Sequence, residues 1–133
     1  MLESRILKEY KSIAVVGASA NPERESYQVA RYLMEQGYRV YPVNPNAREI
    51  AGQTSYPALS AIPDPVEVVN IFRRSEEVLP IVDEAVKIGA KVIWMQTGII
   101  NEAAAARARG AGLLVVMNSC IYEAHQRLGE TAR

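Results

Sequence analysis

Residues 12–19 read Ser-Ile-Ala-Val-Val-Gly-Ala-Ser, a short apolar run that stops at a glycine. A run of this length and composition is typical of a strand that is buried on both faces. Apolar positions at helical spacing follow from Ser26 to Gln36, and Gly37 ends that segment. The stretch therefore predicts a strand, a small turn and a helix, which together form the opening unit of a parallel sheet.

The rest of the chain repeats this alternation. We expect further strands at 39–43, 66–71, 91–95 and 113–116, and further helices at 77–88, 101–111 and 121–128. Pro80 fits a helix only within the first turn, where its missing N–H costs nothing. Right-handed crossovers make these five strands an α/β fold with a doubly wound parallel sheet of Rossmann type. We expect the strand order 3-2-1-4-5.

Composition narrows the class of protein. The 133 residues fit one compact domain spanning 1–133, and the hydrophobic fraction of 49% supplies a core. A formal net charge of zero argues against nucleic acid or an anionic membrane surface as partner. No run approaches the roughly 20 apolar residues of a membrane span, and the charged residues 1–10 do not resemble a secretory signal. We expect a cytoplasmic protein without disulfides, since Cys120 is the single cysteine.

The turn after the first strand is a candidate phosphate site. Ligands of doubly wound sheets bind at the carboxyl ends of the strands where the order reverses, which the expected order places between strands 1 and 4. Gly17 allows a phosphate to approach the backbone, Ala18 and Ser19 leave space, and Arg24 adds a positive charge. The three-glycine dinucleotide fingerprint is absent, so a plain turn is the alternative. Replacing Gly17 with Val is expected to weaken ligand binding while the fold survives.

The turn after the second strand indicates which nucleotide the chain would bind. NAD-dependent enzymes usually place an acid at this strand end, whereas no acid occurs here before Glu49. Pro42 and Pro45 form a stiff ledge that suits a flat adenine ring, or they simply end the strand. Arg48 either reaches a phosphate on the ribose or is a solvated surface residue.

The later turns carry weaker signals. Phe72 either walls an adenine pocket or belongs to the core. Cys120 opens a helix, where a thiol can become reactive, but a small buried apolar role is favoured. His125 lies in mid-helix without a paired Asp or Cys nearby in sequence. No nucleophile–base pair and no metal cluster is visible, so we expect a protein that is not an enzyme.

Several segments together resemble a known family. They are Val16-Gly17-Ala18-Ser19 with Pro22, residues 37–45, Phe72-Arg73, residues 88–91 with 94–98, and Met117-Asn118-Ser119-Cys120. In this order and spacing, the chain resembles the stand-alone coenzyme-A-binding domain proteins. These are similar to the N-terminal domain of the succinyl-coenzyme-A synthetase α subunit, and the resemblance covers nearly the whole chain.

The resemblance implies three groups of ligand-binding residues. The pyrophosphate and pantetheine region would be held by Gly17, Ser19, Ser26 and Tyr27. The adenosine would be enclosed by Val43, Asn44, Pro45, Ile71, Phe72 and Arg73. The pantetheine path would be lined by Thr97 and Gly98 and bordered by Asn118.

Two positions depart from the synthetase pattern. Ala47, followed by Arg48, occupies the place of a phosphate-binding lysine, and Thr97 replaces an acidic residue. The phosphohistidine domain and the ATP-grasp subunit of the synthetase have no counterpart in this chain. The favoured hypothesis is therefore non-catalytic binding of coenzyme A or an acyl derivative. The alternatives are a small NADP-dependent oxidoreductase or redox sensor, and an interaction module that binds no nucleotide.

Overall fold

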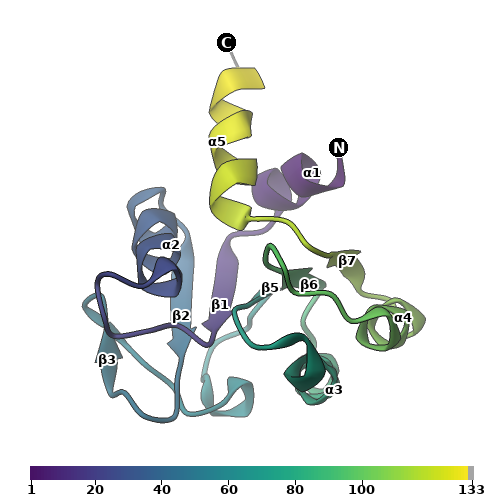
Figure 1. The fold of residues 1–133 in the computed structure, drawn as a ribbon, viewed down its shortest axis with the longest axis horizontal. Helices are drawn as coiled ribbons and strands as arrows, with labels where there is room; N and C mark the ends of the chain where they lie inside the picture. Colours follow the sequence, from purple (N-terminus) through teal and green to yellow (C-terminus); the bar gives the residue numbers. More distant parts are fainter. Residues whose placement is uncertain (132–133) are drawn as a thin grey trace.

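A computed structural model of the protein describes residues 1–131. Within this range a central parallel sheet contains β1 (Ser12–Val16), β2 (Arg39–Val43), β5 (Val68–Ile71), β6 (Val92–Met95) and β7 (Leu114–Val116). A small antiparallel hairpin of β3 (Glu49–Ile50) and β4 (Gln53–Thr54) follows β2. The α/β fold with a five-stranded, Rossmann-like parallel sheet is therefore confirmed (Figure 1).

The strand order β2-β1-β5-β6-β7 differs from the expected order, which is wrong in one respect. The third long strand, β5, lies between β1 and β6 rather than outside β2. Pro42 explains why. Its carbonyl faces the outer side of β2 and accepts a hydrogen bond from Tyr56 N at 2.9 Å, so its missing N–H also faces outward. Because proline is confined to edge strands, β2 is an edge and β5 pairs with the other side of β1.

The carboxylate of Glu67 helps to hold β5 in this position. Lys11 N and Ser12 N both donate to Glu67 Oε1, at 2.9 and 3.2 Å, and Glu67 N donates to Ser12 Oγ at 3.0 Å. The start of β1, together with the residue before it, is thus joined directly to the residue before β5. The strand order consequently reverses between β1 and β5, so a ligand crevice is expected at their carboxyl ends.

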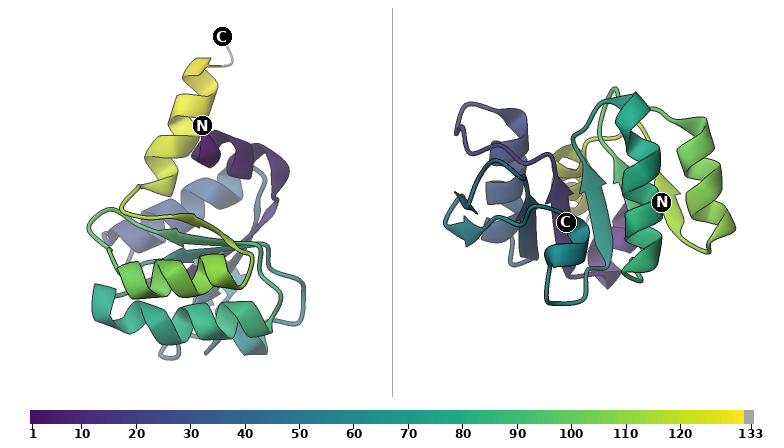
Figure 2. Two further views of the ribbon diagram at one scale, coloured as in Figure 1. Left: turned by 90° about the vertical axis from the view of Figure 1, so that its right-hand side faces the viewer. Right: turned by 90° about the horizontal axis from the view of Figure 1, so that it is seen from below.

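The helices cover both faces of the sheet. They are α1 (Leu2–Glu9), α2 (Glu25–Glu35), α3 (Val78–Lys87), α4 (Glu102–Gly110) and α5 (Ile121–Thr131). Figures 1 and 2 show α3 and α4 on one face and α1, α2 and α5 on the other. The four helices predicted from the sequence are confirmed within a few residues, and Pro80 lies in the first turn of α3.

Successive side chains along each strand point to opposite faces of the sheet, so each face has its own core. Ala14 and Val16 of β1 belong to the core under α3 and α4, whereas Ile13 and Val15 belong to the core under α1, α2 and α5. Trp94 of β6 is fully buried in the second core. The strands are apolar at successive positions because both sides of the sheet are covered.

Two regions of structure were not expected from the sequence. The first is α1, whose residues Ile6 and Leu7 are buried and whose carbonyl at Leu7 accepts the Tyr38 hydroxyl at 2.7 Å. The helix packs beside α5. The second is the link between β2 and β5, which contains the β3–β4 hairpin and a short 3-10 helix, Leu59–Ala61, in place of a long helix.

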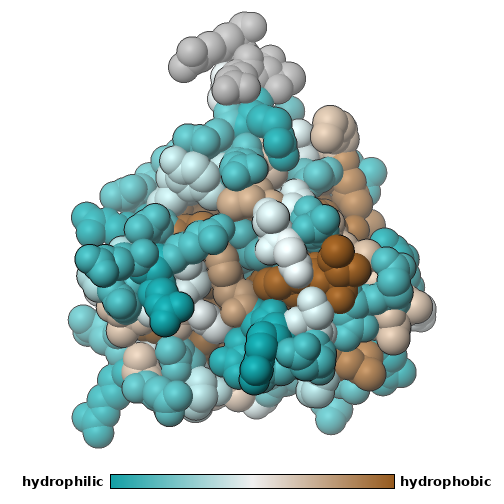
Figure 3. Space-filling model, viewed as in Figure 1, coloured by the Kyte–Doolittle hydropathy of each residue, from teal (hydrophilic) through white to brown (hydrophobic). Residues whose placement is uncertain are grey.

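The surface in Figure 3 is mostly hydrophilic, with an apolar patch near the middle of that face. Ile100, in the loop between β6 and α4, and Leu79 of α3 are exposed large apolar side chains. Within residues 1–131, none of the helices has the length and apolar character needed to span a membrane.

Candidate functional site

Gly17 occupies the point where three strand ends meet. Its N–H donates to the Val43 carbonyl of β2 at 3.0 Å, and the N–H of Phe72 donates to the Val16 carbonyl at 2.8 Å. The backbone of Gly17 has a φ of +88°, and a Cβ there would lie 2.7 Å from the Phe72 carbonyl oxygen. The neighbouring strand end, rather than a ligand, therefore requires a glycine at this position. This contradicts the expectation that Gly17→Val spares the fold.

The loop after Gly17 is ordered by its own polar side chains. Ser19 Oγ accepts the Asn21 N–H at 3.0 Å, and Asn21 Oδ1 accepts the Glu23 N–H at 3.0 Å. Asn44 Nδ2 donates to the Ala18 carbonyl at 2.9 Å, which joins the loops after β1 and β2. Ala18 itself is fully buried. The two predicted loops therefore lie together at the strand ends.

The start of α2 provides free backbone donors near this loop. The first N–H groups of a helix have no partner within it, and Arg24 at the N-cap makes no side-chain capping bond. Ser26 is buried in the first turn. Tyr27 is half-buried and lines hollows beside α2, away from the strand-end cavity described next. Glu25 places a carboxylate in the same turn, so any anion bound here must avoid that charge.

A cavity of about 470 Å³ opens at the carboxyl ends of β1, β2 and β5. Its lining comes from those strand ends, from the 57–58 segment, from the short 3-10 helix Ser75–Glu77 and from α3: Val16, Gly17, Val43, Pro45, Pro57, Ala58, Arg73, Glu76, Glu77, Pro80, Ile81 and Glu84. Four of the predicted site residues are among them. Most of the remaining lining is apolar or acidic, so this cavity suits an uncharged ring better than a phosphate.

The arginines at the site differ in their surroundings. Arg73 Nη2 lies 3.0 Å from Glu77 Oε2, and hydrogen bonds from Arg73 and Arg74 hold the pKa of Glu77 below its ordinary value. Glu77 therefore competes with any phosphate for the Arg73 guanidinium. Arg24 and Arg48 are exposed and form no ion pair with the described residues. Neither lines the strand-end cavity.

The loops after β6 and β7 are joined to each other. Gly98 N donates to Asn118 Oδ1 at 2.7 Å, and Ser119 N donates to the Met95 carbonyl at 3.2 Å. Asn118 has a φ of 58°, a conformation that few residues other than glycine adopt readily. Thr97 is exposed beside this junction. The three residues predicted for the pantetheine path are thus brought together.

The residues at the carboxyl end of β5 contribute to the cores on both faces of the sheet. Ile71 is fully buried under α3 and α4, while Phe72 is half-buried and packs against the core under α2 and α5. Cys120 is buried directly before α5 and lines a hollow of about 500 Å³ between α2 and α5. Residues 1–131 contain no group of three or more His, Cys, Asp or Glu able to hold a metal ion.

Two buried amides were missed by the sequence analysis. Asn70 of β5 and Gln96, directly after β6, are almost completely buried, and Asn70 Nδ2 donates to Gln96 Oε1 at 3.0 Å. Ile121 N, at the start of α5, donates to the same oxygen at 2.9 Å. A signal was present, because Asn70 interrupts an otherwise apolar strand.

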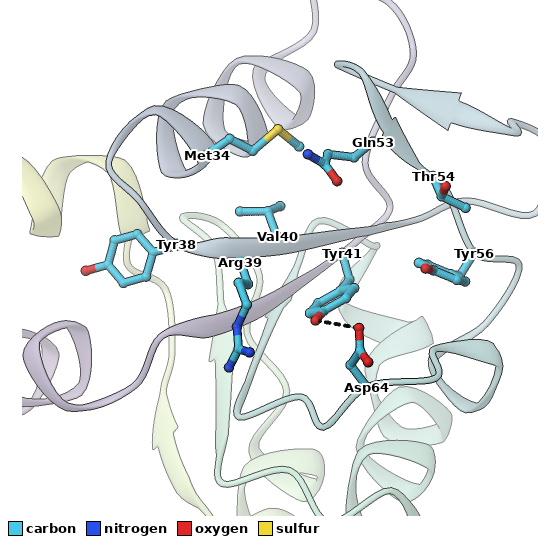
Figure 4. Close-up of a pocket in the computed structure, with 9 residues that line it drawn as sticks. All are labelled: Met34, Tyr38, Arg39, Val40, Tyr41, Gln53, Thr54, Tyr56 and Asp64. Atoms are coloured by element: carbon cyan, nitrogen blue, oxygen red, sulfur yellow. Dashed lines mark hydrogen bonds between the residues drawn. The ribbon is translucent and has the colours of Figure 1, made fainter.

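A second cavity, of about 380 Å³, lies along β2 (Figure 4). The Tyr41 hydroxyl donates to Asp64 Oδ2 at 3.0 Å, and the rings of Tyr41 and Tyr56 are 6.3 Å apart. Burial, followed by the contact with Asp64, raises the pKa of Tyr41. This cavity contains none of the predicted site residues and lies beside residues 39–41, away from the carboxyl end of the strand.

The parallel sheet and the cavity at its strand ends define a Rossmann-like α/β domain. Residues 11–126 match the family described as CoA binding domain, and the chain belongs to that family. The family predicted by resemblance is therefore confirmed.

Three relatives illustrate the range of the family. The uncharacterized protein YneT of Bacillus subtilis is 39% identical over 120 residues, which cover 90% of this chain and 89% of YneT. A solved structure of a hypothetical protein from Pyrococcus horikoshii OT3 is 45% identical, with a TM-score of 0.92 and coverage of 95% of this chain and 89% of that one. The ADP-forming acetate–CoA ligase II of Archaeoglobus fulgidus is 34% identical over 95 residues, which cover 69% of this chain but 14% of the ligase.

Proposed function

We propose that this protein binds coenzyme A, or an acyl derivative of it, at the carboxyl ends of its parallel strands. The observation that carries the proposal is the cavity at the ends of β1, β2 and β5, in a chain of the CoA-binding domain family. Gly17, Val43, Pro45 and Arg73 line that cavity, and each is a residue that the family resemblance implies.

The chemistry of the site favours a particular orientation of the ligand. Val16, Val43 and Pro45 offer an apolar wall for adenine, whereas the three glutamates of the cavity disfavour phosphate there. The uncapped start of α2 is better suited to the pyrophosphate, since backbone N–H groups and the helix dipole favour an anion. Thr97, Gly98 and Asn118 would then face the pantetheine arm.

A ligand panel tests the proposal. We expect coenzyme A to bind more tightly than NADP, NAD to bind most weakly, and loss of the 3′-phosphate to weaken coenzyme A binding. A ligand that binds only the folded state adds about 2.7 kcal/mol of stability at 100 times its Kd, which a thermal shift detects. Competition by NADP at equal or lower concentration than coenzyme A would contradict the proposal.

The same panel identifies the residue that binds the 3′-phosphate. Arg48→Ala should shrink the preference for the phosphorylated ligand, because a charge-assisted hydrogen bond is worth about 1.5–3 kcal/mol. Arg31→Ala is a matched control, since Arg31 is also exposed but pairs with Glu35 on α2. If Arg48→Ala has no effect, Arg73→Ala is the next variant to measure.

We also propose that binding is not followed by catalysis. The described residues contain no metal cluster, and the one histidine, His125, is hydrogen-bonded to Tyr32 rather than to a nucleophile or an acid. The purified protein should leave acetyl- and succinyl-coenzyme A unchanged. Steady turnover that is proportional to protein and lost on denaturation would overturn this part of the proposal.

A further inference from the structure

Two buried polar atoms lack a hydrogen-bond partner among the described residues. They are Asn70 Oδ1 and Gln96 Nε2, and their side chains are 0% and 2% exposed. Buried polar groups are satisfied in the large majority of cases, because leaving one unpaired costs about 1–3 kcal/mol. A pair of such atoms on two touching side chains therefore requires an explanation.

The orientation of the two amides is set by their neighbours. Gln96 Oε1 accepts from Ile121 N at 2.9 Å, so turning the amide over would bring an NH₂ group against that N–H. With the oxygen of Gln96 fixed, Asn70 must direct its Nδ2 toward it, at 3.0 Å. One acceptor, Asn70 Oδ1, and one donor, Gln96 Nε2, are consequently left over.

The pair lies at the junction of the loops that the proposed ligand must pass. Asn70 precedes Ile71 and Phe72, and the Gln96 N–H donates to the Ile71 carbonyl at 3.3 Å. Gln96 is followed directly by Thr97 and Gly98. The bond from Ile121 N ties the pair to the start of α5, which the loop containing Asn118 enters.

We propose that Asn70 and Gln96 form a polar subsite for the pantetheine arm of coenzyme A, an inference that rests on the proposed function. The two free atoms call for a ligand group that can both donate and accept a hydrogen bond. Secondary amides and hydroxyl groups have this property, and the pantetheine arm carries both. Adenine and phosphate groups would instead bind at the ends of β1, β2 and at the start of α2.

Access to the subsite requires a local opening. Both free atoms are shielded from solvent, and the flanking loops are joined by the exposed hydrogen bond from Gly98 N to Asn118 Oδ1. If the bond from Ser119 N to the Met95 carbonyl is kept, opening exchanges only this solvent-exposed bond for contacts with a ligand, which is a small change in free energy. The loops after β6 and β7 would therefore separate when the arm binds.

Two variants test the subsite. Asn70→Val removes the free acceptor, and Gln96→Glu keeps the oxygen that accepts from Ile121 N while removing the free donor. Calorimetry should show that each variant binds coenzyme A about tenfold more weakly, the value of one hydrogen bond of ordinary strength. Binding of adenosine 3′,5′-bisphosphate, which lacks the arm, should remain unchanged in both.

Ser12→Ala is the matched control. Ser12 is a buried polar residue at the opposite end of the sheet, so this variant disturbs folding without approaching the subsite. It should bind both ligands as the unmodified protein does. If both Asn70→Val and Gln96→Glu retain full affinity for coenzyme A, the pair holds an internal water only and the inference is wrong. If the unmodified protein binds neither ligand, the proposed function itself fails.

Thermal stability gives an independent readout. Without ligand, Asn70→Val should change the melting temperature little, because removal of the unsatisfied Oδ1 offsets loss of the hydrogen bond from Nδ2 to Gln96 Oε1. Stability that is retained together with weaker coenzyme A binding would support a binding role. A large loss of stability combined with unchanged affinity would mark Asn70 as purely structural.

Discussion

At the scale of single residues, Gly17 shows how one position serves the sheet and the site together. Its backbone lies against the Phe72 carbonyl and the Arg73 side chain, so the ends of β1 and β5 approach more closely than a side chain would allow. The strand-end cavity is lined by the same glycine. The shape of the proposed site is therefore a consequence of how the two strands pack.

This contact predicts a stability loss. Gly17→Ala should lower the free energy of unfolding by about 2 kcal/mol or more, because it adds steric overlap to the cost of a left-handed conformation. Gly37→Ala is the matched control: Gly37 has a φ of +94° and no atom within 4 Å of its missing Cβ. Denaturant titration should show a larger loss for Gly17→Ala. Equal losses would mean that only backbone strain matters at Gly17.

At the scale of elements, an aromatic cluster joins α2, α5 and the start of β2. The Tyr32 hydroxyl and His125 Nδ1 are 2.6 Å apart, and the His125 ring packs edge-on against Tyr32 and Tyr38. Lys11 lies 5.7 Å from the Tyr38 ring centroid. Burial first, and then the positive charge of Lys11, lower the pKa of His125 from 6.5.

The lowered pKa predicts a dependence of stability on pH. Above the ordinary value of 6.5, His125 is neutral in both the folded and the unfolded chain and contributes no pH dependence. As pH falls below that value, the unfolded chain binds the proton first, so the folded state loses stability until the lowered pKa is passed. Melting temperatures at about pH 8 and about pH 5.5 should differ more in the unmodified protein than in His125→Phe. The same difference in both proteins would contradict this role of His125.

The elements also show what a sequence pattern can and cannot predict. Strands buried on both faces and helices ended by glycine were predictable because their periodicities are local. Helix α1 was missed because its two fully buried residues, Ile6 and Leu7, are surrounded by charged side chains and become a core only against the rest of the fold. The β3–β4 hairpin is too short for periodicity to show.

At the scale of the whole molecule, the order of the strands in the sheet was predicted wrongly, and the reason can be traced to particular residues. Pro42, which lacks an N–H on the outer side of β2, argues against a full strand there, and the outer side is bridged only at Tyr56 among the described residues. The Glu67 contacts that hold β5 beside β1 join residues more than fifty positions apart and leave no local pattern. Which strands become neighbours in a sheet thus depends on a few long-range contacts.

The candidate site was predictable to a similar extent. The rule that ligands bind at the carboxyl ends of strands led to Gly17 and Pro45, and the family resemblance added Val43 and Arg73. All four line one cavity. The pairing of Arg73 with Glu77 could not be foreseen, because it depends on the turn that precedes α3. Which of these residues contact a ligand stays a prediction.

The packing of α1 beside α5 determines where further polypeptide could be attached to this fold. The chain enters through α1, next to the amino end of β1, and α5 runs from the end of β7 back alongside α1 (Figure 1). Any polypeptide attached before α1 or after α5 would leave from that one side, opposite the cavity at the strand ends. Further chain attached on that side would therefore leave the strand-end cavity uncovered. In the Archaeoglobus fulgidus ligase, the region similar to this chain is 14% of the length.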